Sequence, residues 1–294
     1  MFKKVLMLAF LCFSIISSGA LHAYTYLFSH GFGETWRSSR RYVKRYRWAG
    51  REWRNQNYIL DGVIKLFNYP DAIFKGLPPR ISQVGLAQKN EIDKLKNAYD
   101  QIRDENVILF GVSRGASVAI NFTGIHDPRR IKAVVVESPF DHIRNVFYGH
   151  WFVNALSKIP FLTKDHIFKL FLMFTKYREN GEHPIDHIEN IRQDLPIMII
   201  CSEEDGVVPC RSTVNLYKKL LECGHEHAYL VKFDTGKHAK LLWSEHGQQL
   251  RNVVHAFYEK YELPHNSEFA HHGQALLETC QPSLVDLEQE AKNA

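Results

Sequence analysis

The chain has 294 residues, of which 45% are hydrophobic and 23% are charged, and this is an ordinary globular composition. A chain of this length can bury a stable core without a metal or disulfide, which excludes disordered, collagen-like and multi-span membrane proteins as the main interpretation. The 37 Lys and Arg residues against 32 Asp and Glu residues give a net charge of +5, too small to indicate a polyanionic partner by itself.

Residues 1–23 have the pattern of a secretory signal peptide. Two lysines precede an apolar run over residues 5–16, and small residues follow it. We expect cleavage after Ala23 or Ala20 and export to the periplasm or the extracellular space. An uncleaved membrane anchor is the alternative, but the apolar run is shorter than the roughly 20 residues that a bilayer span needs.

From residue 24 to residue 263, short apolar runs alternate with stretches of helical periodicity. This alternation is typical of a mostly parallel sheet with helices on both faces, so we expect a doubly wound α/β domain with about six strands. Strands are predicted over residues 24–29, 58–67, 106–110, 131–136, 196–201 and 228–233. Helices are predicted over residues 36–54, 91–103, 113–125, 212–223 and 245–261.

Two segments lack this alternation of apolar runs and helical periodicity. Residues 142–195 are rich in aromatic side chains, and we interpret them as a helical lid insertion over the sheet. Residues 264–294 are polar and are predicted to form a C-terminal tail or a loosely docked helix. No Gly/Ser-rich linker separates these segments from the rest, so a second domain is not expected.

The sequence Gly111-Val112-Ser113-Arg114-Gly115 joins a predicted buried strand to a predicted helix. This is the context of a nucleophile elbow, in which a sharp turn exposes the serine hydroxyl above the sheet. The glycines are needed there because a side chain would collide with the neighbouring strand or helix. A glycine-rich turn with a helix-capping serine is the structural alternative.

A second glycine motif, His30-Gly31-Phe32-Gly33, ends the first predicted strand. With this motif the sequence resembles the α/β-hydrolase superfamily, whose His-Gly-x-Gly loop and elbow supply the two halves of an oxyanion hole. The resemblance covers nearly the whole predicted α/β domain. It implies that the backbone N–H groups of Phe32 and Arg114 receive the oxyanion.

The superfamily's chain order of nucleophile, acid and base implies where the other catalytic residues lie. Asp205 follows the strand predicted over residues 196–201, and His238 follows the strand predicted over residues 228–233. Both therefore belong at the carboxyl ends of strands, where the ligand sites of open α/β sheets form. The resemblance thus implies a triad of Ser113, Asp205 and His238.

Other residues compete for these two roles. Glu203 and Glu204 adjoin Asp205, although solvated loop charges are their more ordinary role. Asp141 follows an earlier strand and is a further alternative acid, or it caps the next helix. His225 and His227 precede the last predicted strand, so we expect them at the opposite edge of the sheet.

These observations predict a serine hydrolase that cleaves a carboxylic ester or thioester through an acyl-enzyme. A serine peptidase resembling prolyl oligopeptidases or aminopeptidases is one alternative, and a non-catalytic hydrolase-like binding protein is another. Either an acyl compound or a peptide is therefore the expected substrate. No metal or organic cofactor is expected, because neither a tetrahedral ligand set nor a dinucleotide fingerprint is present. The oligomeric state is left open.

The predicted helix over residues 36–54 carries eight cationic residues interleaved with aromatic ones. Such a pattern is most often a solvated face, on which long side chains lie over apolar surface. Contact with an anionic membrane surface through residues 37–54 is the functional alternative. Export argues against a nucleic-acid partner.

Cleavage of the signal leaves an even number of cysteines in a compartment where disulfides can form. Their connectivity is open, and four unpaired thiols are an equal alternative. A straight helix between Cys210 and Cys223 would hold those two about 20 Å apart, which argues against that pair. The four cysteines are Cys201, Cys210, Cys223 and Cys280.

Overall fold

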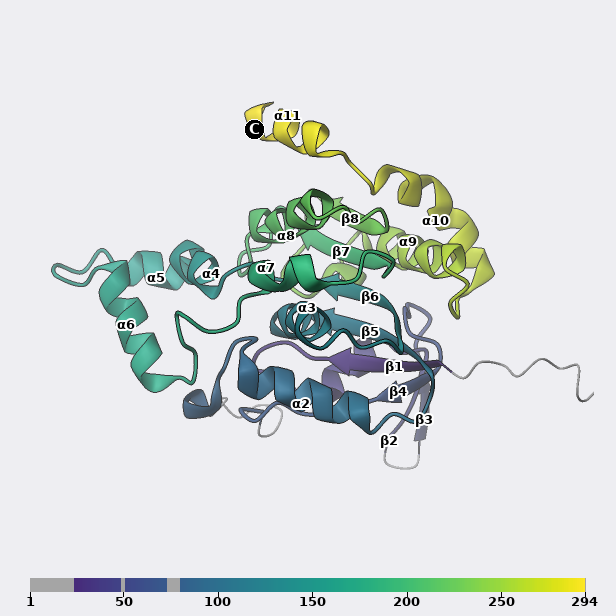
Figure 1. Ribbon diagram of the computed structural model, residues 1–294, viewed down its shortest axis with the longest axis horizontal. Helices are drawn as coiled ribbons and strands as arrows, with labels where there is room; N and C mark the ends of the chain where they lie inside the picture. Colours follow the sequence, from purple (N-terminus) through teal and green to yellow (C-terminus); the bar gives the residue numbers. More distant parts are fainter. Residues whose placement is uncertain (1–23, 49–50, 73–79, 294) are drawn as a thin grey trace, which may run out of the picture.

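Six strands form one sheet in the order β4-β1-β5-β6-β7-β8, with every neighbouring pair parallel (Figure 1). The computed structural model describes residues 24–48, 51–72 and 80–293, so the predicted signal peptide lies outside the described residues. The predicted doubly wound sheet is confirmed. The strands are β1 (Tyr24–Ser29), β4 (Val63–Lys65), β5 (Asn106–Val112), β6 (Ile131–Glu137), β7 (Ile197–Ser202) and β8 (Ala228–Phe233).

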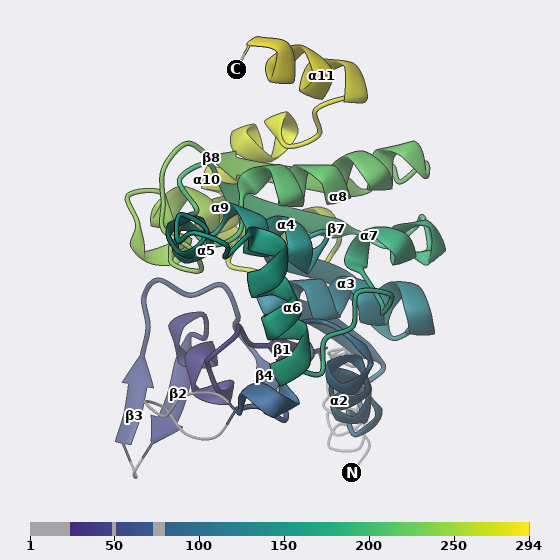
Figure 2. The ribbon, with the colours of Figure 1, turned by 90° about the vertical axis from the view of Figure 1, so that its left-hand side faces the viewer.

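Both faces of the sheet are buried, which explains why its strands are nearly continuous apolar runs. On β5, Val107 and Leu109 point into one core, and Ile108 and Phe110 point into the other. Helices α2, α3 and α8 cover the first face and α9 covers the second (Figure 2). Their bounds are α2 (Lys89–Asp100), α3 (Arg114–His126), α8 (Cys210–Glu222) and α9 (Gly247–Lys260).

The prediction of a single helix over residues 36–54 is wrong. Residues Trp36–Arg41 form a 3-10 helix, and β2 (Arg45–Trp48) pairs with β3 (Arg51–Arg54) in an antiparallel hairpin. Tyr46 lies opposite Trp53, and their rings stack with centroids 6.3 Å apart. Cross-strand aromatic pairs of this kind stabilise a ribbon, which a search for helical spacing overlooks.

The strand predicted over residues 58–67 is also mostly wrong, because only β4 joins the sheet. Tyr58, Ile59 and Leu60 are buried, but they fill the core beneath α9 from outside the sheet. The apolar run over residues 58–67 therefore indicated buried side chains but not a long strand. Three further short 3-10 helices occur in the described residues, at Ile81–Gln83, Ile188–Asn190 and Leu241–Trp243.

A helical insertion separates β6 from β7, and its first three helices lie beyond the carboxyl ends of the strands, whereas its last helix lies against α3 (Figure 1). Phe147, Phe168 and Phe171 pack together within it, and they join the core on the α3 side of the sheet. By contrast, Phe161 is 97% exposed and Phe174 is 64% exposed. The helices of this segment are α4 (Ile143–Gly149), α5 (Trp151–Leu156), α6 (Lys164–Phe174) and α7 (Pro184–His187).

The segment predicted as a polar tail or a loosely docked helix forms two helices, α10 (Ser267–Thr279) and α11 (Leu284–Asn293). Leu277 of α10 is buried in the core beneath α9, and a Cβ on Gly273 would lie only 2.1 Å from the Asn252 carbonyl oxygen. The carbonyl of Cys280 accepts a hydrogen bond of 2.7 Å from Leu230 N–H on the edge strand β8. The segment thus covers a sheet edge that would otherwise present unpaired backbone groups.

One disulfide joins Cys201 at the end of β7 to Cys210 at the start of α8, with Cα atoms 5.4 Å apart. Cys223 and Cys280 are free thiols, so the pair argued against from helix length does not form. In the described part of the chain, no helix is both long enough and apolar enough to cross a bilayer.

Candidate active site

Ser113 lies at the junction of β5 and α3 with φ 54° and ψ −122°. A positive φ is strained for a residue with a side chain, and this conformation holds the hydroxyl away from the helix axis. The turn is tight because a Cβ on Gly115 would lie 2.1 Å from the carbonyl oxygen of Ser29. The Ser113 side chain makes no capping hydrogen bond to α3. The motif is therefore not a glycine-rich turn whose serine caps the helix.

A chain of two hydrogen bonds connects Ser113, His238 and Asp205. The distance from Ser113 Oγ to His238 Nε2 is 2.7 Å, and the distance from His238 Nδ1 to Asp205 Oδ2 is also 2.7 Å. Since the carboxylate can only accept, Nδ1 carries the ring proton and Nε2 accepts from the Ser113 hydroxyl. The structure therefore brings together three residues predicted from distant parts of the sequence.

The Asp205 carboxylate is held by four donors. Oδ1 accepts from the N–H groups of Val207 and Val208, each at 2.9 Å, and Oδ2 accepts from Ser138 Oγ at 2.8 Å in addition to His238. The disulfide closes the loop that carries this aspartate at both of its ends. No sequence motif indicated that Ser138 would hold Asp205, and its positive φ of 53° becomes visible only in the structure.

The alternative acids have other partners. Asp141 is buried and accepts from Ser212, Asn145 and Asn215, so it ties α4 to α8. Its side chain also accepts from the following backbone N–H, at His142. These contacts give Asp141 a structural role away from the imidazole of the triad.

The remaining competitors are also accounted for. Glu203 pairs with Lys232 at 3.2 Å, and Glu204 is exposed. His225 is buried against the Ile191 carbonyl before β8 begins, and His227 is hydrogen-bonded to Tyr261. Both histidines therefore lie at the amino end of that strand, as expected.

The His-Gly-Phe-Gly loop follows β1 and lies against the elbow. A Cβ on Gly31 would be 3.6 Å from Ser113 Cβ, and Gly33 adopts a positive φ of 69°. Arg114 is the first residue of α3, where backbone N–H groups have no partner within the helix. Phe32 is about half exposed, and its ring centre lies 5.5 Å from Arg114 Cζ.

A buried carboxyl group lies behind the triad at the end of β6. Glu137 Oε2 accepts from the Tyr42 hydroxyl at 2.9 Å, and the Glu137 backbone carbonyl accepts from Ser113 N–H at 2.7 Å. Burial raises the pKa of Glu137 above the usual glutamate value. The sequence did not reveal the pairing of Glu137 with Tyr42, because Tyr42 lies in the segment that was wrongly predicted to be a helix.

A cavity of about 370 Å3 lies beside the acid loop, between α4 and α8. Ser113 is not among its lining residues, so the cavity lies apart from the chain of hydrogen bonds that joins Ser113 to Asp205. Throughout residues 24–48, 51–72 and 80–293, no three His, Cys, Asp or Glu side chains are grouped to hold a metal ion. The cavity is lined by Asn145, Tyr148, Pro209, Arg211, Ser212 and Asn215.

Known structures show the same fold. The esterase Pf2001 of Pyrococcus furiosus is 15% identical with a TM-score of 0.54, and 82% of each chain is covered. The acylaminoacyl peptidase of Pyrococcus horikoshii is also 15% identical with a TM-score of 0.54, over 82% of this chain and 38% of the peptidase. MGS-M2, an alpha/beta hydrolase enzyme from a deep-sea metagenome library, is 17% identical with a TM-score of 0.53, over 81% of this chain and 90% of that one.

No curated protein sequence is significantly similar to the chain. The family model described as the prolyl oligopeptidase family matches residues 88–262, which is more than half of the chain. The matched region contains the elbow, the acid loop and the histidine loop. The chain therefore belongs to the prolyl oligopeptidase family, and it is a serine hydrolase of the α/β-hydrolase superfamily.

Proposed function

We propose that the protein hydrolyses a carboxylic ester or thioester through a covalent acyl-serine at Ser113. The observation that carries this proposal is the pair of 2.7 Å hydrogen bonds from Ser113 through His238 to Asp205. A serine hydroxyl is a weak nucleophile until an adjacent base takes its proton, and this geometry supplies that base.

In the proposed reaction, Ser113 Oγ attacks the acyl carbon while its proton passes to His238 Nε2. Asp205 holds the imidazole in the required tautomer and stabilises the cation that forms. His238 then returns the proton to the leaving group, and water releases the acyl group by the same path. The N–H groups of Phe32 and Arg114 receive the oxyanion. The loss of one such donor typically raises the activation barrier by about 3 kcal/mol.

Exposed apolar side chains favour an apolar acyl group. Phe32 in the oxyanion loop is 47% exposed, and the insertion between β6 and β7 exposes Phe161, Met173 and Phe174. Exposed apolar side chains gathered in one segment commonly mark a binding surface. They support an acyl chain as the group held during attack.

Peptide-bond cleavage is the second candidate, and the family match favours it. A series of p-nitrophenyl esters of increasing acyl length, run beside aminoacyl and dipeptidyl p-nitroanilides, separates the two. We expect kcat/KM to rise with acyl length and to exceed that for every anilide. Faster turnover of an anilide would instead assign a peptidase.

We further propose that the protein is exported after cleavage of residues 1–23. The Cys201–Cys210 disulfide supports an oxidising compartment, because such bonds are rare in the cytosol of most organisms. N-terminal sequencing of the protein recovered from the periplasm or medium tests this. A chain that retains residues 1–23 in the membrane fraction would support the anchor instead.

Contact with an anionic membrane is proposed for the basic hairpin, defined as β2 and β3. Arg41 and Lys44 are neutralised by Glu34 and Asp61, each at 2.7 Å, and they are poor candidates for lipid contact. The hairpin residues Arg45, Arg47 and Arg51 are exposed, and the described residues provide them with no carboxylate at ion-pair distance.

Vesicle sedimentation tests this contact. Binding to vesicles with 30% phosphatidylglycerol, weakened by salt and by replacing Arg45, Arg47 and Arg51 with Gln, is the expected result. Equal binding to neutral phosphatidylcholine vesicles would contradict it.

A further inference from the structure

The guanidinium of Arg114 is buried beneath the oxyanion loop together with two carboxylates. Arg114 Nη1 lies 2.6 Å from Asp71 Oδ1 and 3.3 Å from Glu91 Oε1, and none of the three side chains is more than 1% exposed. Its carbon Cζ also lies 4.4 Å from the centre of the Tyr69 ring. Desolvating three charges is unfavourable, so a buried ion cluster is weak evidence of a purely stabilising role.

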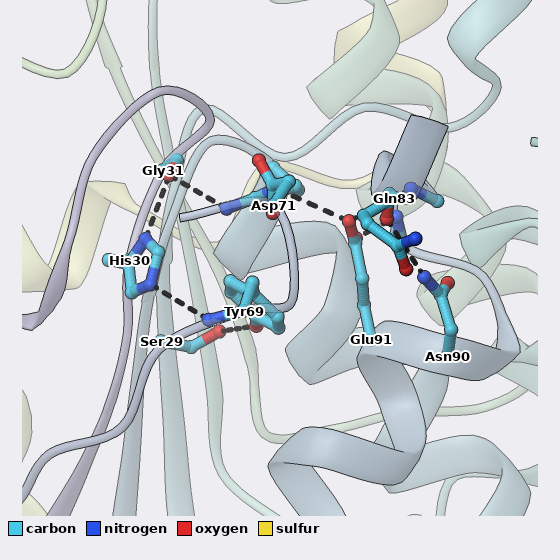
Figure 3. Close-up of polar contacts among 11 residues, drawn as sticks. Ser29, His30, Gly31, Tyr69, Asp71, Gln83, Asn90 and Glu91 are labelled. Carbon is cyan, nitrogen blue, oxygen red and sulfur yellow. Dashed lines mark hydrogen bonds and ion pairs between the residues drawn. The ribbon is translucent and has the colours of Figure 1, made fainter. Parts of the chain in front are cut away.

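The second arm of the same guanidinium reaches the oxyanion loop. Arg114 Nη2 donates to the carbonyl oxygen of Gly31 at 3.2 Å. His30 Nδ1 lies 2.9 Å from that same oxygen, while His30 Nε2 accepts from Tyr69 N–H at 3.3 Å (Figure 3). A backbone N–H can only donate, so Nε2 is the unprotonated nitrogen and Nδ1 donates to Gly31.

The ring of His30 stays neutral at neutral pH. Burial, with the nearby charge of Arg114 in addition, lowers the pKa of His30 to about 3. The carbonyl of Gly31 therefore accepts two hydrogen bonds, one from a fixed cation and one from a neutral ring.

The Gly31 carbonyl and the Phe32 N–H belong to one planar trans peptide, so they point in opposite directions. Two donors that hold the carbonyl on the Arg114 side therefore turn the N–H toward the opposite side. Glycine has the freedom to let this peptide rotate, and a rotated peptide would offer an oxygen to the developing negative charge.

We propose that the Arg114 side chain is a positioning residue that holds the Gly31–Phe32 peptide with its N–H toward the acyl oxygen. The inference rests on the proposed function, in which Phe32 N–H receives the oxyanion. One residue then serves both halves of the oxyanion hole, with its backbone N–H on one side and its guanidinium behind the other.

The two carboxylates keep the guanidinium in place. Asp71 and Glu91 both contact Nη1, which leaves Nη2 directed at Gly31. Glu91 also accepts from the N–H groups of Gly85 and Ala87, at 3.1 Å and 2.7 Å, so it is itself fixed at the start of α2.

The variant Arg114→Lys keeps a cation between the carboxylates but removes the forked second arm. We expect kcat for the best ester to fall between tenfold and a hundredfold with KM within twofold, because the lost interaction acts on the transition state. The affinity of an alkylboronic acid, which forms an oxyanion-like adduct, should fall by the same factor. Wild-type kcat in this variant would overturn the proposal.

Arg130→Lys is a matched control. Arg130 also stacks on a tyrosine, with 4.4 Å from Cζ to the Tyr99 ring centre, and also donates to carbonyl oxygens. It precedes β6 and so lies at the edge of the sheet opposite Ser113. We expect this variant to keep the wild-type kcat and KM.

A second pair of variants covers the case in which Arg114→Lys does not fold. His30→Leu removes the neutral donor to Gly31, while His30→Asn restores an N–H group near the position of Nδ1. We expect kcat to fall in the first variant and to recover at least in part in the second. An equal loss in both would contradict a hydrogen-bonding role.

A crystal structure of Arg114→Lys tests the positioning without any turnover. We expect the Gly31 carbonyl to be rotated or to occupy two orientations. An unchanged peptide would overturn the inference even in an active enzyme. If the wild type cleaves neither esters nor anilides, the proposed function fails, and this structure still decides whether Arg114 fixes the peptide.

Discussion

Three residues with side chains adopt a positive φ immediately around the triad. Ser113 itself has φ 54°, Ser138 has 53°, and Ala239, which follows His238, has 53°. Each such conformation costs on the order of 1 kcal/mol or more, and it persists only where the surrounding fold imposes it. Three of the eight described non-glycine residues with positive φ thus lie where Ser113, Asp205 and His238 meet.

Ser138 is expected to matter through its hydroxyl. Ser138→Ala and Ser138→Gly both remove the donor at 2.8 Å from Asp205 Oδ2, and we predict that each lowers kcat about tenfold, the value of one hydrogen bond to a charged group. Glycine also relieves the positive φ. If Ser138→Gly alone kept full activity, the positive φ of the backbone, and not the hydroxyl, would be what activity requires at this position.

The proximity of Ser113, Asp205 and His238 was predictable because three short motifs follow strand ends in a fixed chain order. The supporting residues were not. Ser138 donates to a residue 67 positions away, and the Arg114 side chain contacts Asp71, 43 positions away. Such pairings depend on how the strands are ordered in the sheet, and no local pattern encodes that order.

At the scale of elements, strands buried on both faces were predicted best. β1 and β8 begin and end at the predicted residues, because continuous apolar runs leave little choice of structure. The prediction of a helix across β2 and β3 is wrong, since the aromatic residues of this hairpin fit both periodicities. The polar sequence of α10 concealed its docking, which depends on a few small or apolar residues such as Gly273 and Leu277.

The docking of α10 has a measurable consequence. Leu277 is 3% exposed and packs in the core with α9, so Leu277→Ala should lower the free energy of unfolding by about 2–5 kcal/mol. Val285 on α11 is 70% exposed, and Val285→Ala should change it by less than about 0.5 kcal/mol. Urea unfolding measures both. Equal, negligible effects would mean that the segment is a loose tail after all.

For the whole molecule, buried neutral histidines link stability to pH. Burial lowers the pKa of His30 to about 3 and the pKa of His255 to about 4. In the unfolded chain both return toward about 6.5, so below that pH the unfolded state binds more protons than the folded state. The stability they contribute is complete above pH 6.5 and is lost as the pH falls toward their folded values.

Proton uptake by each histidine in the unfolded state should lower the free energy of unfolding by about 3 kcal/mol between pH 7 and pH 4. His255→Asn abolishes one of these proton uptakes, so the variant should lose about 3 kcal/mol less than the wild type over that range. Urea unfolding at pH 7, 6, 5 and 4 measures the difference. Parallel pH profiles for the two proteins would contradict the assignment.

Active-site labelling tests the central claim most directly, because it requires no knowledge of the natural substrate. The wild type should form a covalent adduct with a fluorophosphonate probe, and peptide mapping should place it on Ser113. Ser113→Ala should keep its fold and take up no label, while Asp205→Asn should be labelled far more slowly. Labelling that persists in folded Ser113→Ala, or a wild type that stays unlabelled, would contradict the account.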